Sequence, residues 1–100
     1  MKGAAEFGEY HSGRVDLDVQ PEQKQKAIAL FSDHAFTYIL EWPVTRRENM
    51  DGIKVYLGDI GWVMVRASGT ENLLRVYSET SRRKTTNQVL AAVTQIIQNL

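Results

Sequence analysis

A short polar segment, Arg66-Ala67-Ser68-Gly69-Thr70-Glu71, interrupts the most apolar part of the sequence and carries groups that suit phosphate binding. Gly69 would let backbone N–H groups approach an anion with no side chain in the way. Ser68 and Thr70 would add hydroxyl donors, and the planar guanidinium of Arg66 could bind two phosphate oxygens at once. Local composition alone favours a simpler interpretation, a hairpin turn with an arginine at the end of a strand.

The other polar residues indicate no catalytic centre and no metal site. His11 and His34 are far apart in the sequence and have no Cys or Asp cluster beside them, which favours surface or local hydrogen-bonding roles. Asp16 and Asp18 share one face of a predicted strand, where a solvated surface or a contact with a neighbouring domain is favoured over acid/base work. Arg82-Arg83-Lys84 is expected to be a solvated turn before the last helix, because no aromatic residues interleave it as in nucleic-acid patches.

Composition limits the class of protein. The 100 residues are 43% hydrophobic and 24% charged, which suits one small domain with its own core. Lys plus Arg and Asp plus Glu are 12 each, so the formal net charge is zero and neither nucleic acid nor an anionic membrane is an expected partner. With no Cys, no apolar run near the roughly 18 residues of a membrane span and no signal peptide at Met1–Glu6, we expect a cytoplasmic protein.

The first half of the chain predicts a strand, a helix and an edge strand. Residues 14–19 alternate apolar and charged side chains, which is typical of a strand with one buried face. Pro21 and Glu22 predict the start of a helix that weakens near Ser32-Asp33. Its apolar stripe comprises Ala27, Ile28, Phe31 and Ala35. Phe36–Trp42 is too short for its pattern to decide between helix and strand; Pro43 is expected to end it, and 44–49 to form an edge strand.

The second half predicts a hairpin, a third strand and a helix. Residues 53–57 and 62–66 flank a loop whose Gly58 and Gly61 can supply positive φ, and residues 73–79 form the next strand. Thr85 and Gln88 match a capping box that would open the last helix. That helix has an apolar stripe of Val89, Val93, Ile96, Ile97 and Leu100, and we expect Trp62, Met64 and Tyr77 in the core rather than stacked on a ligand. The order predicts an α+β domain with both helices on one face of an antiparallel sheet.

A longer string around the polar segment carries a family resemblance. Residues 61–79, Gly-Trp-Val-Met-Val-Arg-Ala-Ser-Gly-Thr-Glu-Asn-Leu-Leu-Arg-Val-Tyr-Ser-Glu, resemble the signature of the C-terminal domain of the α-D-phosphohexomutases, the phosphoglucomutase/phosphomannomutase family. Upstream of this string, the segment Asp51-Gly52-Ile53-Lys54-Val55 is similar to the Asp-Gly-Val-Lys strand of the same family domain. Phe7-Gly8-Glu9-Tyr10 looks like the opening of that domain, less specifically. The resemblance runs from about Phe7 to the last helix.

The resemblance implies a fold and a site. The family's enzymes have four domains, and this chain is similar to the fourth, a small antiparallel sheet with two helices on one face in a two-layer sandwich like the TATA-binding-protein domain. Residues 1–8 would be a flexible lead-in and residues 9–100 the phosphate-binding domain. In the family, an arginine and a Ser-Gly-Thr loop hold the substrate phosphate that is not being transferred. Those positions here are Arg66, Ser68, Gly69 and Thr70.

Two positions depart from the family pattern. Ala67 and Asn72 stand where the family usually has proline, so we expect an unbound loop that is less preorganised but retains every proposed donor. Arg75 and Glu71 could line the pocket, or could pair with each other or with Arg66 to support the loop, and support is favoured over direct binding.

The resemblance also implies what this chain lacks. The family's catalytic phosphoserine and its magnesium motif belong to the first and second domains, so we expect no catalytic residue, no metal ligand and no mutase activity in the isolated chain. The full enzyme would need magnesium and a bisphosphorylated hexose activator. It would interconvert 1- and 6-phosphates of glucose, mannose or N-acetylglucosamine, with the remaining domains of the same polypeptide as partners. The alternative is a stand-alone phosphate-binding or interaction module without mutase activity.

Overall fold

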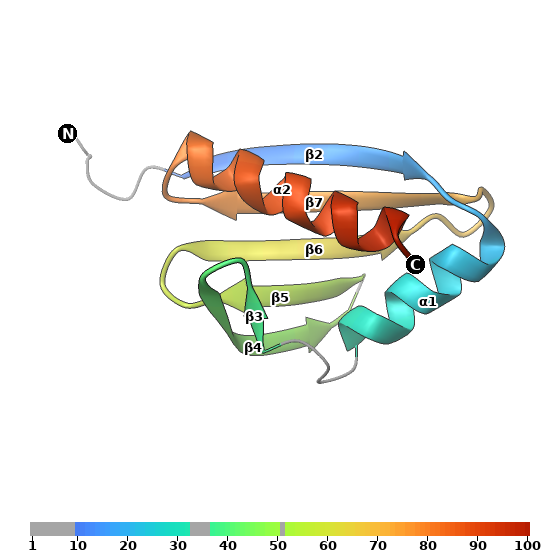
Figure 1. Cartoon of the computed structure of the whole chain (residues 1–100), viewed down its shortest axis with the longest axis horizontal. Helices are drawn as coiled ribbons and strands as arrows, with labels where there is room; N and C mark the ends of the chain where they lie inside the picture. The colour runs from blue at the N-terminus through green and yellow to red at the C-terminus, as the bar shows by residue number, and fades with distance from the viewer. Residues whose placement is uncertain (1–9, 33–36, 51) are drawn as a thin grey trace.

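Over residues 10–32, 37–50 and 52–100, which a computed structural model describes, six strands form one antiparallel sheet and two helices cover one of its faces (Figure 1). The spatial order of the strands is β2-β7-β6-β5-β4-β3, so β2 and β7, far apart in sequence, lie side by side. The strands are β2 (His11–Asp18), β3 (Tyr38–Ile39), β4 (Trp42–Asn49), β5 (Ile53–Leu57), β6 (Gly61–Ala67) and β7 (Leu73–Thr80). This architecture confirms the α+β class and the two-layer arrangement.

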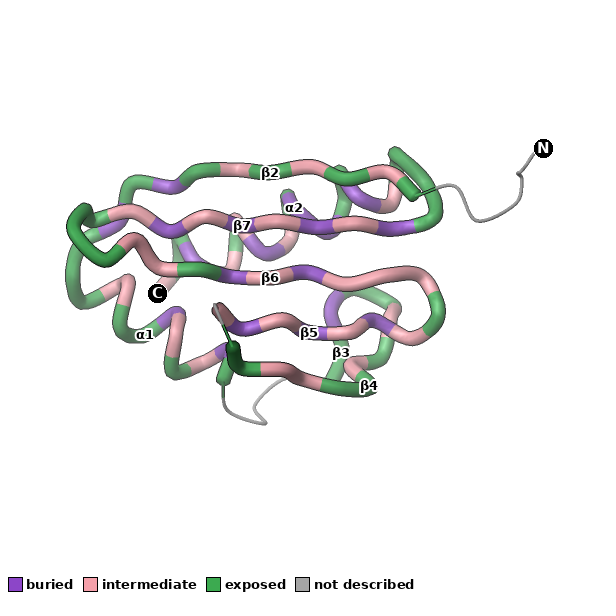
Figure 2. The backbone as a smooth tube through the Cα atoms, turned by 180° about the vertical axis from the view of Figure 1, so that it is seen from behind, coloured by how far each residue is buried: buried purple, intermediate pink, exposed green. Residues whose placement is uncertain are grey.

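The core lies between the sheet and the two helices, α1 (Pro21–Ser32) and α2 (Arg83–Gln98). Alternate residues of the strands point to the helices, so burial alternates along β5 and β7, as the view from behind shows (Figure 2). Phe31 from α1 and Val93 from α2 are fully buried against this inner face. In the described ranges, neither helix has both the length and the apolar character that a membrane span requires.

The hairpin between β5 and β6 forms as predicted. Gly58 and Gly61 adopt φ values of 54° and 147°, in the region that favours glycine. A Cβ at Gly61 would lie 2.0 Å from the carbonyl oxygen of Glu79, so the close approach of β7 also requires glycine there. The predicted helix stripes hold as well: Ala27 and Phe31 are buried in α1, and Val89, Val93 and Ile97 in α2, whereas Ala35 lies outside the described residues.

Pro43 does not end the segment before it, and that prediction is wrong. The ambiguous segment contains strand β3 and a turn at Leu40, whose φ is 55°, and Pro43 is the second residue of β4, opposite Tyr38. Proline has no N–H to donate, and Pro43 lies beyond Val44–Leu57, the last pair of the ladder between β4 and β5. The carbonyl of Pro43 still accepts a hydrogen bond from the N–H of Gly58 at 2.9 Å.

The predicted capping box at Thr85 is also wrong, because the N-cap of α2 is Arg82, three residues earlier. Arg82 occupies the N-cap position without a side-chain cap hydrogen bond, and Arg83 and Lys84 form the first turn of the helix instead of a preceding turn. The hydroxyl of Thr80 replaces the expected cap by accepting a hydrogen bond from the N–H of Arg82 at 3.3 Å. Thr80, at the end of β7, therefore accepts the N–H at the start of α2 that the capping-box pattern assigned to a side chain of the helix.

Trp62, Met64 and Tyr77 are not core residues, contrary to the prediction. They are half-buried on the open face of the sheet, because their neighbours Val63, Val65 and Val76 occupy the inner face. The ammonium of Lys54 lies 4.4 Å from the ring centre of Trp62 and 5.2 Å from that of Tyr56. Cation–π contacts thus cover part of the aromatic surface on this face.

Candidate functional site

The loop between β6 and β7, residues 68–72, is closed by two of its own hydrogen bonds. The N–H of Ser68 donates to the carbonyl of Leu73 at 3.0 Å, directly after the last cross-strand pair, Ala67 and Leu74. The N–H of Glu71 donates to Oγ of Ser68 at 3.3 Å. The hydroxyl of Ser68 thus accepts from inside the loop and keeps its own proton free to donate outward.

Several donors of this loop are free. In residues 10–32, 37–50 and 52–100, the backbone N–H groups of Gly69, Thr70 and Asn72 have no hydrogen-bond acceptor, and neither does the hydroxyl of Thr70. Gly69 and Thr70 are exposed, and a Cβ placed at Gly69 would meet no atom within 4 Å. Gly69 therefore opens onto space that a ligand can occupy, and these unpaired donors suit an anion.

Arg66 lies on β6, two residues before Ser68, and its side chain is exposed. Across the described part of the chain it makes no ion pair. Arg66 lines a hollow of about 270 Å³ on the open face of the sheet, together with Glu48, Met50, Gly52, Lys54 and Met64. The structure thus places Arg66, Ser68, Gly69 and Thr70 at one end of the sheet, with the exposed Arg66 on the strand that leads into the loop, although no described loop residue lines the hollow of Arg66.

Among the described residues, Glu48 is the one carboxylate that lines this hollow. The hydroxyl of Tyr56 donates to Oε1 of Glu48 at 2.7 Å, and Arg46 Nη2 lies 2.9 Å from Oε2. The Tyr56 hydrogen bond is the main cause that lowers the pKa of Glu48, opposed by desolvation and assisted by the charges of Arg46 and Lys54. The negative charge of Glu48 is therefore already partnered, which leaves Arg66 available to an anion.

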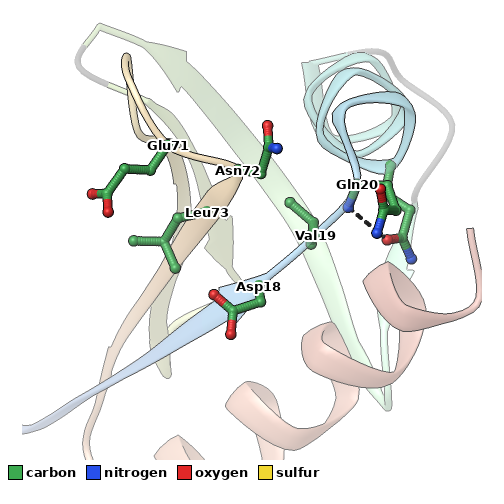
Figure 3. A pocket seen from close by; sticks show the side chains of 7 residues that line it. Asp18, Val19, Gln20, Glu71, Asn72 and Leu73 are labelled. Atoms are coloured by element: carbon green, nitrogen blue, oxygen red, sulfur yellow. Dashed lines mark hydrogen bonds between the residues drawn. The ribbon is translucent and has the colours of Figure 1, made fainter.

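A second hollow, of about 410 Å³, lies on the other flank of the loop, between β7 and the start of α1 (Figure 3). Its lining includes the carboxylates of Asp18 and Glu71. Gln23 Oε1 accepts a hydrogen bond from the N–H of Gln20 at 3.0 Å at the beginning of the helix. Although this hollow is larger, two carboxylates repel phosphate, so charge favours the side of Arg66.

Lys24 on α1 contacts the loop, and sequence reasoning missed it. Its Nζ donates to the carbonyl of Ser68 at 3.0 Å and to the carbonyl of Glu71 at 3.1 Å. The N–H of Val19 donates to the carbonyl of Asn72 at 3.0 Å. No signal in the sequence distinguishes Lys24, since it is 44 positions from Ser68 and sits among other polar helix residues.

Arg75 and Glu71 do not form the ion pairs considered above. Arg75 is half-buried on β7, opposite Arg66 on one side and Asp16 on the other, and its Nε has no hydrogen-bond partner. Within the described residues no ion pair joins Glu71 to Arg66 or to Arg75. Glu71 supports the loop through its backbone: its N–H donates to Ser68 and its carbonyl accepts from Lys24.

The remaining candidates lie away from the loop donors or outside the described residues. Asp16 and Asp18 are exposed on one face of β2, and Asp16 Oδ1 is 3.4 Å from Nε of Arg14. His11 is half-buried, and its carbonyl accepts a hydrogen bond from the hydroxyl of Thr86 at 2.6 Å. His34 lies outside the described residues, and among those that are described no group of His, Asp and Glu is arranged to hold a metal ion.

These observations define a class: a two-layer α+β domain with a donor-rich loop at one end of its sheet. The family model described as the C-terminal domain of phosphoglucomutase/phosphomannomutase matches residues 18–96, and the chain belongs to this family. The matched region contains Arg66, the loop and Lys24, and it confirms the resemblance seen in the sequence. No curated protein matches the chain.

Proposed function

We propose that this chain binds the phosphate of a hexose phosphate that is not being transferred while a phosphohexomutase interconverts hexose 1- and 6-phosphates. The observation that carries the proposal is the set of unpaired donors at one loop: the N–H groups of Gly69, Thr70 and Asn72, on the loop that follows the strand of the exposed Arg66. Oriented backbone N–H groups and a guanidinium are the groups that proteins use for phosphate. Family membership supports the same assignment.

The chemistry of this site is binding and orientation. Hydrogen-bond donors at the loop would hold the oxygens of one phosphate, and the hydroxyls of Ser68 and Thr70 would rotate to suit the oxygen that they face. Such a cradle contacts the phosphate and leaves the sugar free, so it can accept the 1-phosphate or the 6-phosphate of the same hexose. The phosphate at the loop thereby positions the other end of the sugar for reaction elsewhere in the enzyme.

The groups that transfer the phosphoryl belong to other domains in this proposal. Among the described residues no group of His, Asp and Glu could hold a metal ion. In line with the family resemblance, we assign magnesium, the bisphosphorylated activator and the catalytic serine to the remaining domains. The cytoplasm is the proposed location, supported by a sequence without cysteine.

Calorimetry on the 100-residue chain tests the proposal. Glucose 1-phosphate and glucose 6-phosphate should bind with affinities within about threefold of each other, and glucose should not bind, because the loop recognises only the phosphate. Both affinities should fall as salt rises, since Arg66 is exposed to screening. Binding of glucose itself, or no response to either phosphate at tens of millimolar, would contradict the proposal.

A further inference from the structure

The loop needs an external support to hold its donors in place. Residues 68–72 contain one glycine and no proline, and Gly69 touches nothing on the side where a Cβ would stand. The loop's own hydrogen bonds fix the N–H groups of Ser68 and Glu71 alone. The peptide units that carry the N–H groups of Gly69 and Asn72 are therefore free to rotate unless their carbonyls are held.

Lys24 holds both of those peptide units. Its ammonium accepts no hydrogen bond and donates to two carbonyl oxygens, Ser68 O at 3.0 Å and Glu71 O at 3.1 Å. The carbonyl of Ser68 shares a peptide plane with the N–H of Gly69, and the carbonyl of Glu71 shares one with the N–H of Asn72. In a trans peptide the C=O and N–H point in opposite directions.

It follows that Lys24 aims two of the three free N–H groups away from α1. The two carbonyls point to the helix, so the N–H groups of Gly69 and Asn72 point to the opposite side of the loop. The ammonium also neutralises carbonyl dipoles that would otherwise repel an anion at the loop. Hydrogen bonds to charged groups are stronger than neutral ones, so one lysine can order two peptide units.

We propose that Lys24 is a positioning residue of the phosphate site, which orients the N–H groups of Gly69 and Asn72 before the ligand arrives. The inference rests on the proposed function, because orienting these N–H groups matters only if the loop binds a phosphate ligand. Lys24 acts through the loop backbone and does not itself contact the phosphate. Preorganisation of this kind raises the apparent affinity by raising the population of the competent loop.

The test uses three variants of the 100-residue chain and two probes, inorganic phosphate and glucose 1-phosphate, at constant ionic strength. Lys24→Met removes the ammonium and keeps the aliphatic stem. Lys24→Arg keeps donors for two carbonyls. Lys26→Met is the matched control, because Lys26 is exposed on the same helix and has no hydrogen bond to the loop. Amide spectra of the ligand-free loop, affinities and melting temperatures are measured for each.

Lys24→Met should shift the amide resonances of Gly69 and Asn72 in the ligand-free chain and weaken both probes about five- to tenfold. Lys24→Arg should stay within about threefold of the parent chain, and Lys26→Met should be unchanged. If Lys24→Met lowers the melting temperature by more than the control does, Lys24→Gln gives the same comparison with a shorter polar side chain. A loss of stability alone would not explain these results. If Lys24 only stabilised the fold, the folded molecules of Lys24→Met would bind phosphate as tightly as the parent chain.

Two results would overturn the inference. Unchanged affinity in Lys24→Met would show that the loop is ordered without Lys24. Reduced affinity with unchanged ligand-free amide resonances at Gly69 and Asn72 would make Lys24 a direct ligand instead. If the parent chain binds neither probe, the proposed function fails, and the ligand-free spectra of Lys24→Met still decide whether Lys24 orders the loop.

Discussion

Arg66 on β6 and Arg75 on β7 are direct cross-strand partners, so two guanidinium groups leave the sheet from opposed positions on the same open face. On its other side Arg75 faces Asp16 of β2, whereas among the described residues no cross-strand partner of Arg66 is a carboxylate. Like charges directly opposite each other are unfavourable. The pair therefore leaves Arg66 with positive charge that an anion would balance, at the strand end that leads into the loop.

Substitution of Arg66 should weaken phosphate binding. Arg66→Ala is expected to lower the affinity for glucose 1-phosphate about tenfold or more, because charge-assisted hydrogen bonds contribute about 1.5–3 kcal/mol. Arg66→Lys keeps the charge but loses the planar fork, so its affinity should lie between those of the parent chain and Arg66→Ala. Arg14→Ala is the control, since Arg14 is also exposed on this face but lies on β2. Calorimetry gives the comparison, and equal affinities for Arg66→Ala and Arg14→Ala would remove Arg66 from the site.

Two glycines should respond oppositely to alanine. At Gly69 an added Cβ meets no atom of the chain, so Gly69→Ala should leave the free energy of unfolding within about 0.5 kcal/mol and weaken phosphate binding by obstructing the approach of the ligand. At Gly61 the added Cβ would meet the backbone of Glu79 and φ is 147°, so Gly61→Ala should destabilise the fold by about 2 kcal/mol or more. Denaturant unfolding and phosphate titration separate the two effects. A Gly69→Ala chain that binds phosphate normally would contradict the proposed approach to the loop.

The ionisation of Glu48 should depend on Tyr56. The tyrosine hydrogen bond lowers the pKa of Glu48, so the stabilisation from this contact is present above the ordinary pKa of glutamate and is lost as pH falls through the lowered pKa. Tyr56→Phe should raise the pKa of Glu48, and carboxyl NMR titration measures this directly. Tyr77→Phe serves as the control, because Tyr77 lies on the same face and no hydrogen bond joins its hydroxyl to Glu48. An unchanged pKa in Tyr56→Phe would mean that the charges of Arg46 and Lys54 dominate.

The hydroxyl of Thr86 should contribute to stability through the start of α2. It donates to the carbonyl of His11 at 2.6 Å and lies 2.8 Å from the hydroxyl of Thr80, with both threonines fully buried. Thr86→Val keeps the shape and leaves these groups short of a partner, which should cost about 1–3 kcal/mol. Thr85→Val, next in the helix and less buried, should cost less. If Thr85→Val were the more damaging change, the buried hydroxyl of Thr86 would not be the main polar contribution to stability at the start of α2.

Local patterns predicted most of the fold. The alternation in 14–19, the glycines at 58 and 61 and the apolar stripe of α2 led to the observed elements, because each reports a property of neighbouring residues. The predictions made at Pro43, Thr85 and Trp62 were wrong for a common reason. Their outcome depended on features that the local pattern does not show: the end of the β4–β5 ladder beside Pro43, the N-cap position of Arg82, and a second sheet face that the helices leave uncovered.

The residues of the candidate site likewise fall into those that the sequence could identify and those that it could not. Arg66, Ser68, Gly69 and Thr70 lie within one five-residue segment, so their composition and family resemblance were enough to select them. Lys24 could not be selected, because its role exists only when α1 packs beside the β6–β7 loop. That Asn72 makes the unbound loop less rigid stays a prediction. In the described structure its carbonyl accepts a hydrogen bond from the N–H of Val19, and its own N–H is a free donor.

The most direct test of the central claim is a titration of the chain with glucose 1-phosphate at constant ionic strength, followed by amide correlation spectra. The account predicts that the amides of Ser68, Gly69, Thr70 and Asn72 shift together with a single dissociation constant. Those of Gln20 and Gln23, which line the acidic hollow, should remain in place. Shifts confined to the acidic hollow, or a loop that stays unchanged at saturating ligand, would contradict phosphate binding at this site.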